Sequence, residues 1–411
     1  ESTVRALKKA DNAPMFRREF NLEKTDIESA RIYATSAGVY DLYFNGEKAS
    51  NAFLTPSWTE YSKHLMYQTY DVTEQIKNGG NVIGAQLGNG WYAGRIGRYG
   101  QIPAFLCKMV ITYKDGSKQI IVSDENWKVY TAGPVIYNDL FDGEHYDNRL
   151  YPTGWSEPNY SENDNWLNAL SIDKNDLKIG EIIAQIGPNI QVMDQLTAKS
   201  VNQIATDTFI YDFGQNFAGV PLLTFTGEKD LKIRIRYAEM LNDASNTGDG
   251  SIGTLYTKGL RSAKATDYYI FGSNEKETWM PSLTYHGFRY LEIKGLSKAL
   301  PLNDVKGLVT YSCLENTASF ETSEPLINQL CSNAYWSQRS NFLGVPTDCP
   351  QRDERAGWTG DTQIFFGTAS YFMNTKEFYL KALMDINDNQ RSNGAYNDVA
   401  PGGFTSVFQN S

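Results

Sequence analysis

The hydrophobic pattern of this chain changes once, near residue 322. Before that point apolar residues alternate with polar ones in short runs, such as residues 30–36, 109–113 and 231–237. After it they recur at helical spacing, and the first such set is Leu326, Ile327, Leu330, Ala334 and Tyr335. Alternation is typical of strands with one buried face, whereas a period near 3.6 is typical of amphipathic helices. The sequence therefore predicts a β-rich part followed by a helical part.

The β-rich part divides into two stretches. Strand-like runs cover residues 13 to about 130 and again about 190 to 310, and Asn45-Gly46 between apolar runs is a strong hairpin signal. Short strands at regular spacing favour sandwich domains. A polar stretch at residues 152–172, with Pro, Gly and Asn, is predicted to be a closing loop.

The helical part is predicted to begin with a helix capped by Thr322 or Ser323, with Pro325 in its first turn. Further helices are expected at about 360–373 and after residue 375. Two or three helices in some 90 residues cannot bury their apolar faces alone. We expect them to begin a larger helical domain.

Composition limits the partners and the compartment only in part. The formal charge of −10 and the pI of about 5.0 argue against nucleic acid or an anionic membrane as partner. No apolar run approaches the ~20 residues of a membrane helix, and no apolar leader is visible at the start. The compartment and the oligomeric state stay open, with periplasm or secretion slightly favoured over cytoplasm. Four scattered cysteines without CxxC spacing predict neither a zinc site nor a disulfide framework.

Residues 347–361 are the most unusual segment: Thr-Asp-Cys-Pro-Gln-Arg-Asp-Glu-Arg-Ala-Gly-Trp-Thr-Gly-Asp. They place four carboxylates, two arginines and a tryptophan in a glycine-broken loop between helices. Charge at such a place must be paired or hydrated. One interpretation is a carboxylate site that grips a polar ligand. The alternative is a salt-bridged loop in which Asp353, Arg355 and Asp361 pair with one another and support the helices.

This segment, placed between helices after two β regions, resembles glycoside hydrolase family 78, the bacterial inverting α-L-rhamnosidases. Matches to the β domains of that family occur at residues 55–61, 87–95, 211–219 and 281–290. The resemblance implies a multidomain fold: two antiparallel β-sandwich domains, at 1–175 and 176–312, followed by the start of an (α/α)6 barrel at 313–411. It implies hydrolysis of terminal α-L-rhamnose from glycosides or polysaccharides, with inversion and without a cofactor.

The same resemblance implies roles for single residues. Inverting hydrolysis needs a protonated acid at the leaving oxygen and a carboxylate base behind a water molecule. By family position, Glu354 is the general acid, and Asp348 and Arg352 hold sugar hydroxyls. The further substrate-binding residues expected are Asp353, Trp358, Asp361 and Asp398. Arg355 is interpreted as structural. The family's general base is a glutamate far downstream in the barrel. No residue here is assigned that role, so we expect the 411 residues by themselves to be inactive or very slow.

Metal binding is not predicted, although a structural calcium ion stays open. Some family members bind rhamnose and calcium in the first β domain, but Ser50-Asn51 offers no Asp-Asn pair for this. An acidic run either takes a cation or forms a solvated face, with the second favoured; its members are Asp139, Asp142, Glu144 and Asp147.

Four aromatic residues form either a sugar platform or packed core, with core favoured: Trp58, Tyr61, Trp91 and Tyr92. Residues 88–94 are predicted to make a tight β turn. His286 is either a catalytic group or a satisfied histidine at a domain junction, with the second favoured because no nucleophile motif accompanies it. Rival functions are an (α/α)6 glycosidase for another deoxysugar or a uronate, and a non-catalytic carbohydrate-binding β-sandwich protein.

Overall fold

The computed structural model describes residues 2–6, 12–97, 99–245 and 248–402. The chain forms two compact units. The first comprises residues 1–139 and 150–185, and the second comprises residues 140–149 and 186–411. The sequence predicts three domains, at 1–175, 176–312 and 313–411. The division into two compact units does not test these bounds, so they stay a prediction.

The first unit holds two sheets. One sheet has the strand order β15 (Leu170–Asp173), β1 (Ser2–Arg5), β9 (Ala104–Tyr113), β3 (Ile27–Ala37), β7 (His64–Asp71), β16 (Glu181–Ala184), with β10 (Lys118–Val122) on β9. The other has the order β14 (Trp166–Asn168), β11 (Lys128–Tyr130), β2 (Met15–Asn21), β8 (Gly80–Gly88), β4 (Val39–Phe44), β5 (Glu47–Lys48). Shorter elements of the unit are β6 (Ala52–Phe53), α1 (Gly90–Ala93) and β12 (Val135–Asp139).

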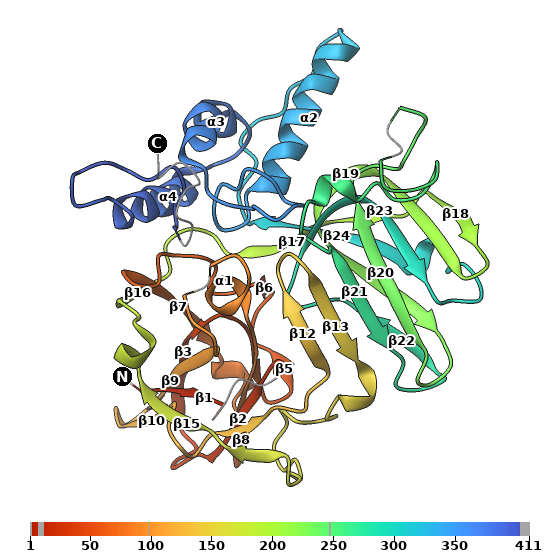
Figure 1. Cartoon of the computed structure of the whole chain (residues 1–411). Coiled ribbons are helices and arrows are strands. Elements are labelled where there is room, and N and C mark those ends of the chain that lie inside the picture. Colours follow the sequence, from red (N-terminus) through yellow and green to blue (C-terminus); the bar gives the residue numbers. More distant parts are fainter. Residues whose placement is uncertain (1, 7–11, 98, 246–247, 403–411) are drawn as a thin grey trace. The chain divides into compact units, whose positions relative to one another are not determined.

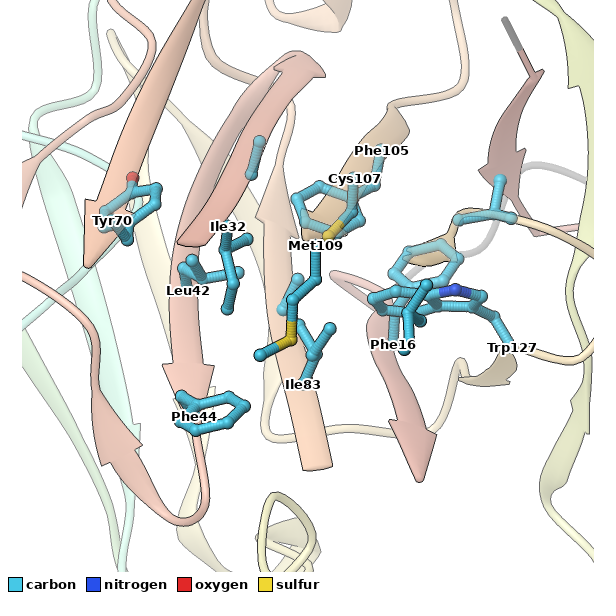
Figure 2. Packing of buried hydrophobic residues seen from close by; sticks show 14 of the residues in the cluster. Phe16, Ile32, Leu42, Phe44, Tyr70, Ile83, Phe105, Cys107, Met109 and Trp127 are labelled. Carbon is cyan, nitrogen blue, oxygen red and sulfur yellow. The ribbon is translucent and has the colours of Figure 1, made fainter. Parts of the chain in front are cut away.

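Side chains from both sheets fill one shared core (Figure 2). Ile32 of β3 and Met109 of β9 meet Phe16 of β2 and Ile83 of β8, and all four are fully buried. Alternate residues of each strand point inward, as the alternation in the sequence predicts. A sandwich of two sheets results.

The aromatic set of the first unit is packed core. Trp58, Tyr61, Trp91 and Tyr92 are each at most 3% exposed, and the Trp58 and Trp91 rings stack at 6.3 Å. The core interpretation is confirmed, and the sugar platform is ruled out for these four residues. The β turn predicted at residues 88–94 is wrong, because α1 makes a helical turn there.

The closing loop predicted at 152–172 is also partly wrong. It contains β14 and the start of β15, which pair with β11 and β1. Two of its own residues, Trp155 and Trp166, are buried. Its polar composition hid these strands, because both are short and most of their side chains are exposed or half-exposed.

The strands of the second unit form one curled sheet (Figure 1). Its order is β13 (Gly143–Asp147), β21 (Thr266–Ile270), β20 (Lys232–Ala238), β23 (His286–Lys294), β19 (Thr208–Thr226), β24 (Val305–Ser312), β17 (Ile190–Thr197). Two more strands, β18 (Ser200–Ala205) and β22 (Lys276–Trp279), also pair with β19. The pairing of β19 with β23 shifts register between Asp212 and Phe217, which lets the long strand bend. The multidomain, β-rich fold predicted from the sequence is confirmed.

Three helices follow in the second unit: α2 (Pro325–Asn341), α3 (Thr359–Phe372) and α4 (Lys376–Asp388). Their positions match the prediction. Each helix end that was predicted at a particular residue lies within two residues of it. The cap of α2 is Glu324, whose side chain accepts the Leu326 N–H, and not Thr322 or Ser323. The Thr322 hydroxyl instead accepts the N–H of Glu324, the residue directly before the first helical residue.

Within the described ranges, no helix is long and apolar enough to cross a membrane. All four cysteines are free, as the absence of a disulfide framework predicts.

Candidate functional site

The charged loop between α2 and α3 is held against the β-sheet of the second unit. The Thr347 N–H donates to Asn341 at 2.8 Å, and Ser312 of β24 donates to the Phe342 carbonyl at 2.7 Å. A Cβ atom on Gly287 of β23 would lie 2.8 Å from Pro350 Cγ. The absence of a side chain at Gly287 therefore allows the loop to approach the strand this closely.

Arg355 anchors the loop from inside. Its side chain is buried, and its guanidinium donates to the carbonyl oxygens of Leu140, Tyr285, Gln351 and Arg352 at 2.5–3.1 Å. Its φ of +52° is unusual for a residue with a side chain, and such conformations persist only where the surroundings impose them. These contacts support the structural interpretation of Arg355.

A chain of four charged side chains crosses the site. Arg352 donates through Nη2 to Asp348 Oδ2 at 3.2 Å and through Nε to Glu354 Oε2 at 2.9 Å. Arg261, which is 93 residues away in the sequence, donates to the same Glu354 Oε2 at 2.9 Å. The structure thus brings the three central predicted residues together and adds Arg261, which sequence reasoning missed.

Asp348 is the buried end of this chain, with only 7% of its side chain exposed. Its Oδ1 accepts the Ala356 N–H at 2.9 Å, which fixes the carboxylate across the loop. Burial raises the pKa of Asp348, and its hydrogen bonds from Cys349 and Ala356 act in the opposite direction.

Glu354 is the more accessible of the two carboxylates, with 21% of its side chain exposed against 7% for Asp348. Both arginines bind Oε2. In the part of the chain that the structure describes, no hydrogen bond reaches Oε1. One carboxyl oxygen is therefore fixed while the other is presented to a ligand.

Asp353 points to a different partner. Its Oδ2 accepts the hydroxyl of Ser262, and the Ser262 N–H lies at 3.3 Å. Among the described residues, Asp353, Arg355 and Asp361 make no ion pair with one another, so this part of the salt-bridged alternative is wrong. The loop does contain ion pairs, but they join Arg352 to Asp348 and Glu354. Carbonyl contacts to Arg355 and the hydrogen bond with Ser262 also hold it.

A cavity of about 500 Å³ lies between α2 and α3, and Asp348 and Asp361 both line it. Asp361 is exposed in the first turn of α3, where the helix dipole favours a carboxylate. Trp358 precedes that helix, is half-buried, and has no described hydrogen-bond partner for its Nε1–H. The carbonyl of Asp398 accepts the Thr359 N–H at 2.8 Å, so Asp398 lies beside the same helix start with an exposed side chain.

One group of potential metal ligands occurs among the described residues: Asp348, Cys349 and Glu354, with ligand atoms within 4.8 Å of one another. Arg352 already supplies positive charge to both carboxylates of this group. Burial raises the pKa of the Cys349 thiol to about 12.

The acidic run is buried, so the expected solvated face is wrong. Asp142 pairs with Lys264 Nζ at 3.3 Å, and Asp147 pairs with Arg149 at 2.6 Å. Glu144 accepts two backbone N–H groups, those of Ser282 and Leu283. The fourth member, Asp139, accepts the Arg95 N–H within the first unit.

His286 lies on β23 and is fully buried. Its Nε2 lies 3.1 Å from Asp267 Oδ1, and its ring stacks on Tyr237 at 4.0 Å. The interpretation as a satisfied histidine at a domain junction is only partly confirmed. Nδ1 is buried without a hydrogen-bond partner among the described residues, and His286 lies within the sheet of one unit.

The site also holds Glu239, directly after β20, which no sequence argument singled out. Asn216 donates to Glu239 at 2.7 Å, and burial raises the pKa of Glu239, while Arg352 and Arg355 act in the opposite direction. Glu239 follows a strand that alternates regularly, so it carried no distinct signal. Arg261 and Ser262 gave none either, because their partners are about 90 residues away.

Three domain families match the chain in succession. They are described as the α-L-rhamnosidase N-terminal domain at residues 25–194, the bacterial α-L-rhamnosidase concanavalin-like domain at 202–311, and the bacterial α-L-rhamnosidase 6 hairpin glycosidase domain at 315–411.

Curated relatives are similar over nearly the whole chain. An α-L-rhamnosidase of Streptomyces avermitilis is 40% identical over 95% of this chain and 37% of its own length. One of Formosa agariphila is 37% identical over 94% of this chain and 42% of its own length. The chain therefore spans about two fifths of the curated relatives it matches.

Solved structures agree with these matches. The Streptomyces avermitilis α-L-rhamnosidase complexed with L-rhamnose superimposes with a TM-score of 0.90 at 39% identity, over 96% of this chain and 38% of the other. An α-L-rhamnosidase from Dictyoglomus thermophilum gives 0.89 at 38% identity, over 96% and 43%.

Proposed function

We propose, from the premise that the chain belongs to the bacterial α-L-rhamnosidase family, that it is part of an enzyme hydrolysing terminal α-L-rhamnose from glycosides or polysaccharides with inversion. The observation that carries the proposal is Glu354. Its Oε2 is held by Arg352 and Arg261, while no hydrogen bond reaches Oε1 from the described residues. A proton on Oε1 would be placed for transfer to the leaving oxygen.

The proposed reaction is a single displacement. Glu354 gives its proton to the glycosidic oxygen as the bond from that oxygen to the anomeric carbon breaks. A water molecule attacks the same carbon from the opposite face and loses a proton to a carboxylate base ~6.5–9.5 Å from the acid. The released sugar and the protonated leaving group are the products, and no cofactor takes part.

The cavity beside Asp348 is the proposed place of the rhamnose ring. The buried carboxylate of Asp348 and the guanidinium of Arg352 offer an acceptor and donors for sugar hydroxyls. Asp361 and Asp398 add carboxylates near the start of α3, and Trp358 adds an apolar wall. The main role of Asp353 is to orient the loop through Ser262, and a direct contact with the substrate is its secondary role.

The three helices are proposed to begin an (α/α)6 barrel. Large apolar side chains stand exposed along them, including Leu326 at 79%, Leu330 at 67% and Ile364 at 85%. Faces of this kind are stable when further helices cover them. The share of the relatives' length that this chain spans supports the same view.

Hydrolysis of an aryl α-L-rhamnoside by the full-length protein tests the function. We expect release of L-rhamnose, with the β-anomer as first product by NMR if inversion holds. The Glu354→Gln variant keeps the shape and contacts but carries no transferable proton. Full activity of this variant would overturn the acid assignment. The inactivity expected of the 411 residues by themselves stays a prediction, and turnover at full-length rates would refute it.

A further inference from the structure

A second cavity of the second unit, of about 510 Å³, has an unusual lining. Nine residues line it, and none of them carries a carboxyl group. Three arginines, a lysine and a histidine do line it: Arg234, Arg236, Arg261, Lys264 and His145. The whole chain has a net charge of −10, so this cavity is a concentration of positive charge in an acidic protein.

The strand register explains how the basic side chains meet. Arg234 and Arg236 are two residues apart on β20, so both point to the same face of the sheet. Tyr268 of β21 pairs with Arg234, and His145 of β13 pairs with Tyr268. Three adjacent strands therefore form the floor of the cavity.

The wall is the segment between η4 (Lys258–Leu260) and β21. Leu260 and Ala263 are at most 5% exposed and fix this segment to the sheet. Between and after them, Arg261 and Lys264 extend outward, with side chains 54% and 70% exposed. The cations of the wall are thus accessible and stand on an anchored segment.

The positive charge of the cavity is only partly compensated. Three cations of the cavity have a carboxylate partner: Arg234 pairs with Glu292 at 2.7 Å, Lys264 with Asp142 at 3.3 Å, and Arg261 with Glu354 at 2.9 Å. Arg236 has no carboxylate within 4.0 Å in the ranges that the structure describes. Its Nη2 donates to the Thr257 hydroxyl at 3.2 Å.

The surroundings of Arg236 also affect its ionisation. Burial and the neighbouring Arg234 lower the pKa of Arg236, while Glu292 and Asp249 act in the opposite direction. An anion in the cavity would relieve this repulsion and replace water around the guanidinium.

The position of this cavity relative to Glu354 indicates which part of a substrate would reach it. Asp348 lines the first cavity and Arg261 lines the second, and the ion pairs from Asp348 through Arg352 and Glu354 to Arg261 connect the two. A general acid stands at the boundary between the released sugar and the leaving group. With rhamnose in the first cavity, the leaving group extends toward the second.

We propose that the cavity lined by Arg236, Arg261 and Lys264 binds an anionic substituent of the leaving group, a uronate carboxylate or a sulfate ester. The proposal rests on the rhamnosidase function and defines its substrate class as acidic glycosides. Arginine forks suit both anions, because two N–H groups can bind two oxygens of either.

The test compares three rhamnosides with the full-length protein: a rhamnosyl-glucuronate disaccharide, its carboxyl-reduced counterpart, and a 6-sulfated form of that counterpart. We expect kcat/KM to be at least about tenfold higher for one or both anionic compounds. The preference should shrink when the ionic strength is raised from about 0.05 to 0.5 M, since accessible charges are screened. A preference for the carboxylate or for the sulfate identifies which anion is recognised.

Variants assign the preference to the cavity. Arg236→Gln should lower the ratio of anionic to neutral kcat/KM about tenfold or more, and the exposed Lys264→Gln should lower it several-fold. Lys276→Gln, which changes an exposed lysine of β22 outside the cavity, is the matched control and should leave the ratio unchanged. Equal kcat/KM for all three compounds, or a preference that both cavity variants retain, overturns the inference while the rhamnosidase function stands.

A binding measurement separates the two proposals. If no compound releases rhamnose, the proposed function fails. Calorimetric titration of free glucuronate and inorganic sulfate against wild type and Lys264→Gln then decides the anion site. Binding that weakens in the variant supports the site, and equal or absent binding overturns it.

Discussion

Two acidic segments of the second unit look alike in sequence and do opposite things in the structure. In residues 142–147 each carboxylate is buried and has partners of its own: a lysine, two backbone N–H groups, or an arginine. In residues 348–354, Arg352 links Asp348 and Glu354, and a distant arginine adds a third charge. Acidic composition therefore does not mark a site. The difference is that one arginine joins two carboxylates of the same loop, and one of these, Glu354, is accessible.

The largest expected effect concerns Glu354, the more accessible of the two carboxylates that Arg352 links. Glu354→Gln should lower kcat by about 10²–10⁴-fold, the usual contribution of general acid catalysis. Its melting temperature should stay close to that of wild type, because Gln preserves size and an acceptor for Arg352. Steady-state kinetics on an aryl α-L-rhamnoside and a thermal melt measure the two. A large drop in stability would make Glu354 structural and remove the contrast with residues 142–147.

Arg355 tests the buried support of the same loop. Arg355→Lys should lower the free energy of unfolding by about 2–4 kcal/mol, because an ammonium cannot reach all four carbonyl oxygens that the guanidinium binds. Chemical denaturation gives this value. Arg289→Lys, at a half-exposed pair with Asp212, is the matched control and should cost less. A smaller effect at Arg355 than at Arg289 would contradict the anchoring role.

Glu144 tests the other acidic segment. Glu144→Gln should lower the free energy of unfolding by about 1–2 kcal/mol, since the backbone N–H groups of Ser282 and Leu283 lose a charged acceptor. Activity at a temperature well below the melt should not change. A fall in kcat/KM without loss of stability would give this segment a part in the site and break the comparison.

The smallest effect is a pH dependence at Asp348. Burial raises the pKa of this carboxyl, so its protonated form is favoured in the folded state. Its contribution to stability is therefore full below the ordinary Asp pKa of about 3.9 and is lost as pH rises through the raised folded value. Asn resembles the protonated form. The Asp348→Asn variant should therefore gain stability relative to wild type as the pH rises from about 3.5 to 7, measured by denaturation at each pH.

A constant or falling difference over that range would mean that Arg352 and the Ala356 N–H outweigh burial. The same variant should weaken substrate binding if Asp348 holds a sugar hydroxyl, so KM should rise. Unchanged KM would place Asp348 with the supporting residues.

Much of the fold followed from local pattern. Alternation located the β-rich stretches, helical spacing located all three helices, and the aromatics around Trp58 were correctly assigned to core. The errors lie where the local signal is weak. The strands β14 and β15 are short and polar, and the glycine-rich composition of residues 88–94 did not reveal the helical turn at Gly90–Ala93.

The residues 347–361 could be chosen as a site from the sequence because so many charges in a loop between helices need partners. Periodicity and composition are local properties, and they decided the β-rich and helical parts and this segment. Which partners the charges found was decided by tertiary structure. Arg261 reaches Glu354, and Ser262 reaches Asp353, only because the curled sheet holds the 257–265 segment against the loop. Contacts between residues about 90 positions apart depend on strand register and curvature, and no short stretch of sequence contains them.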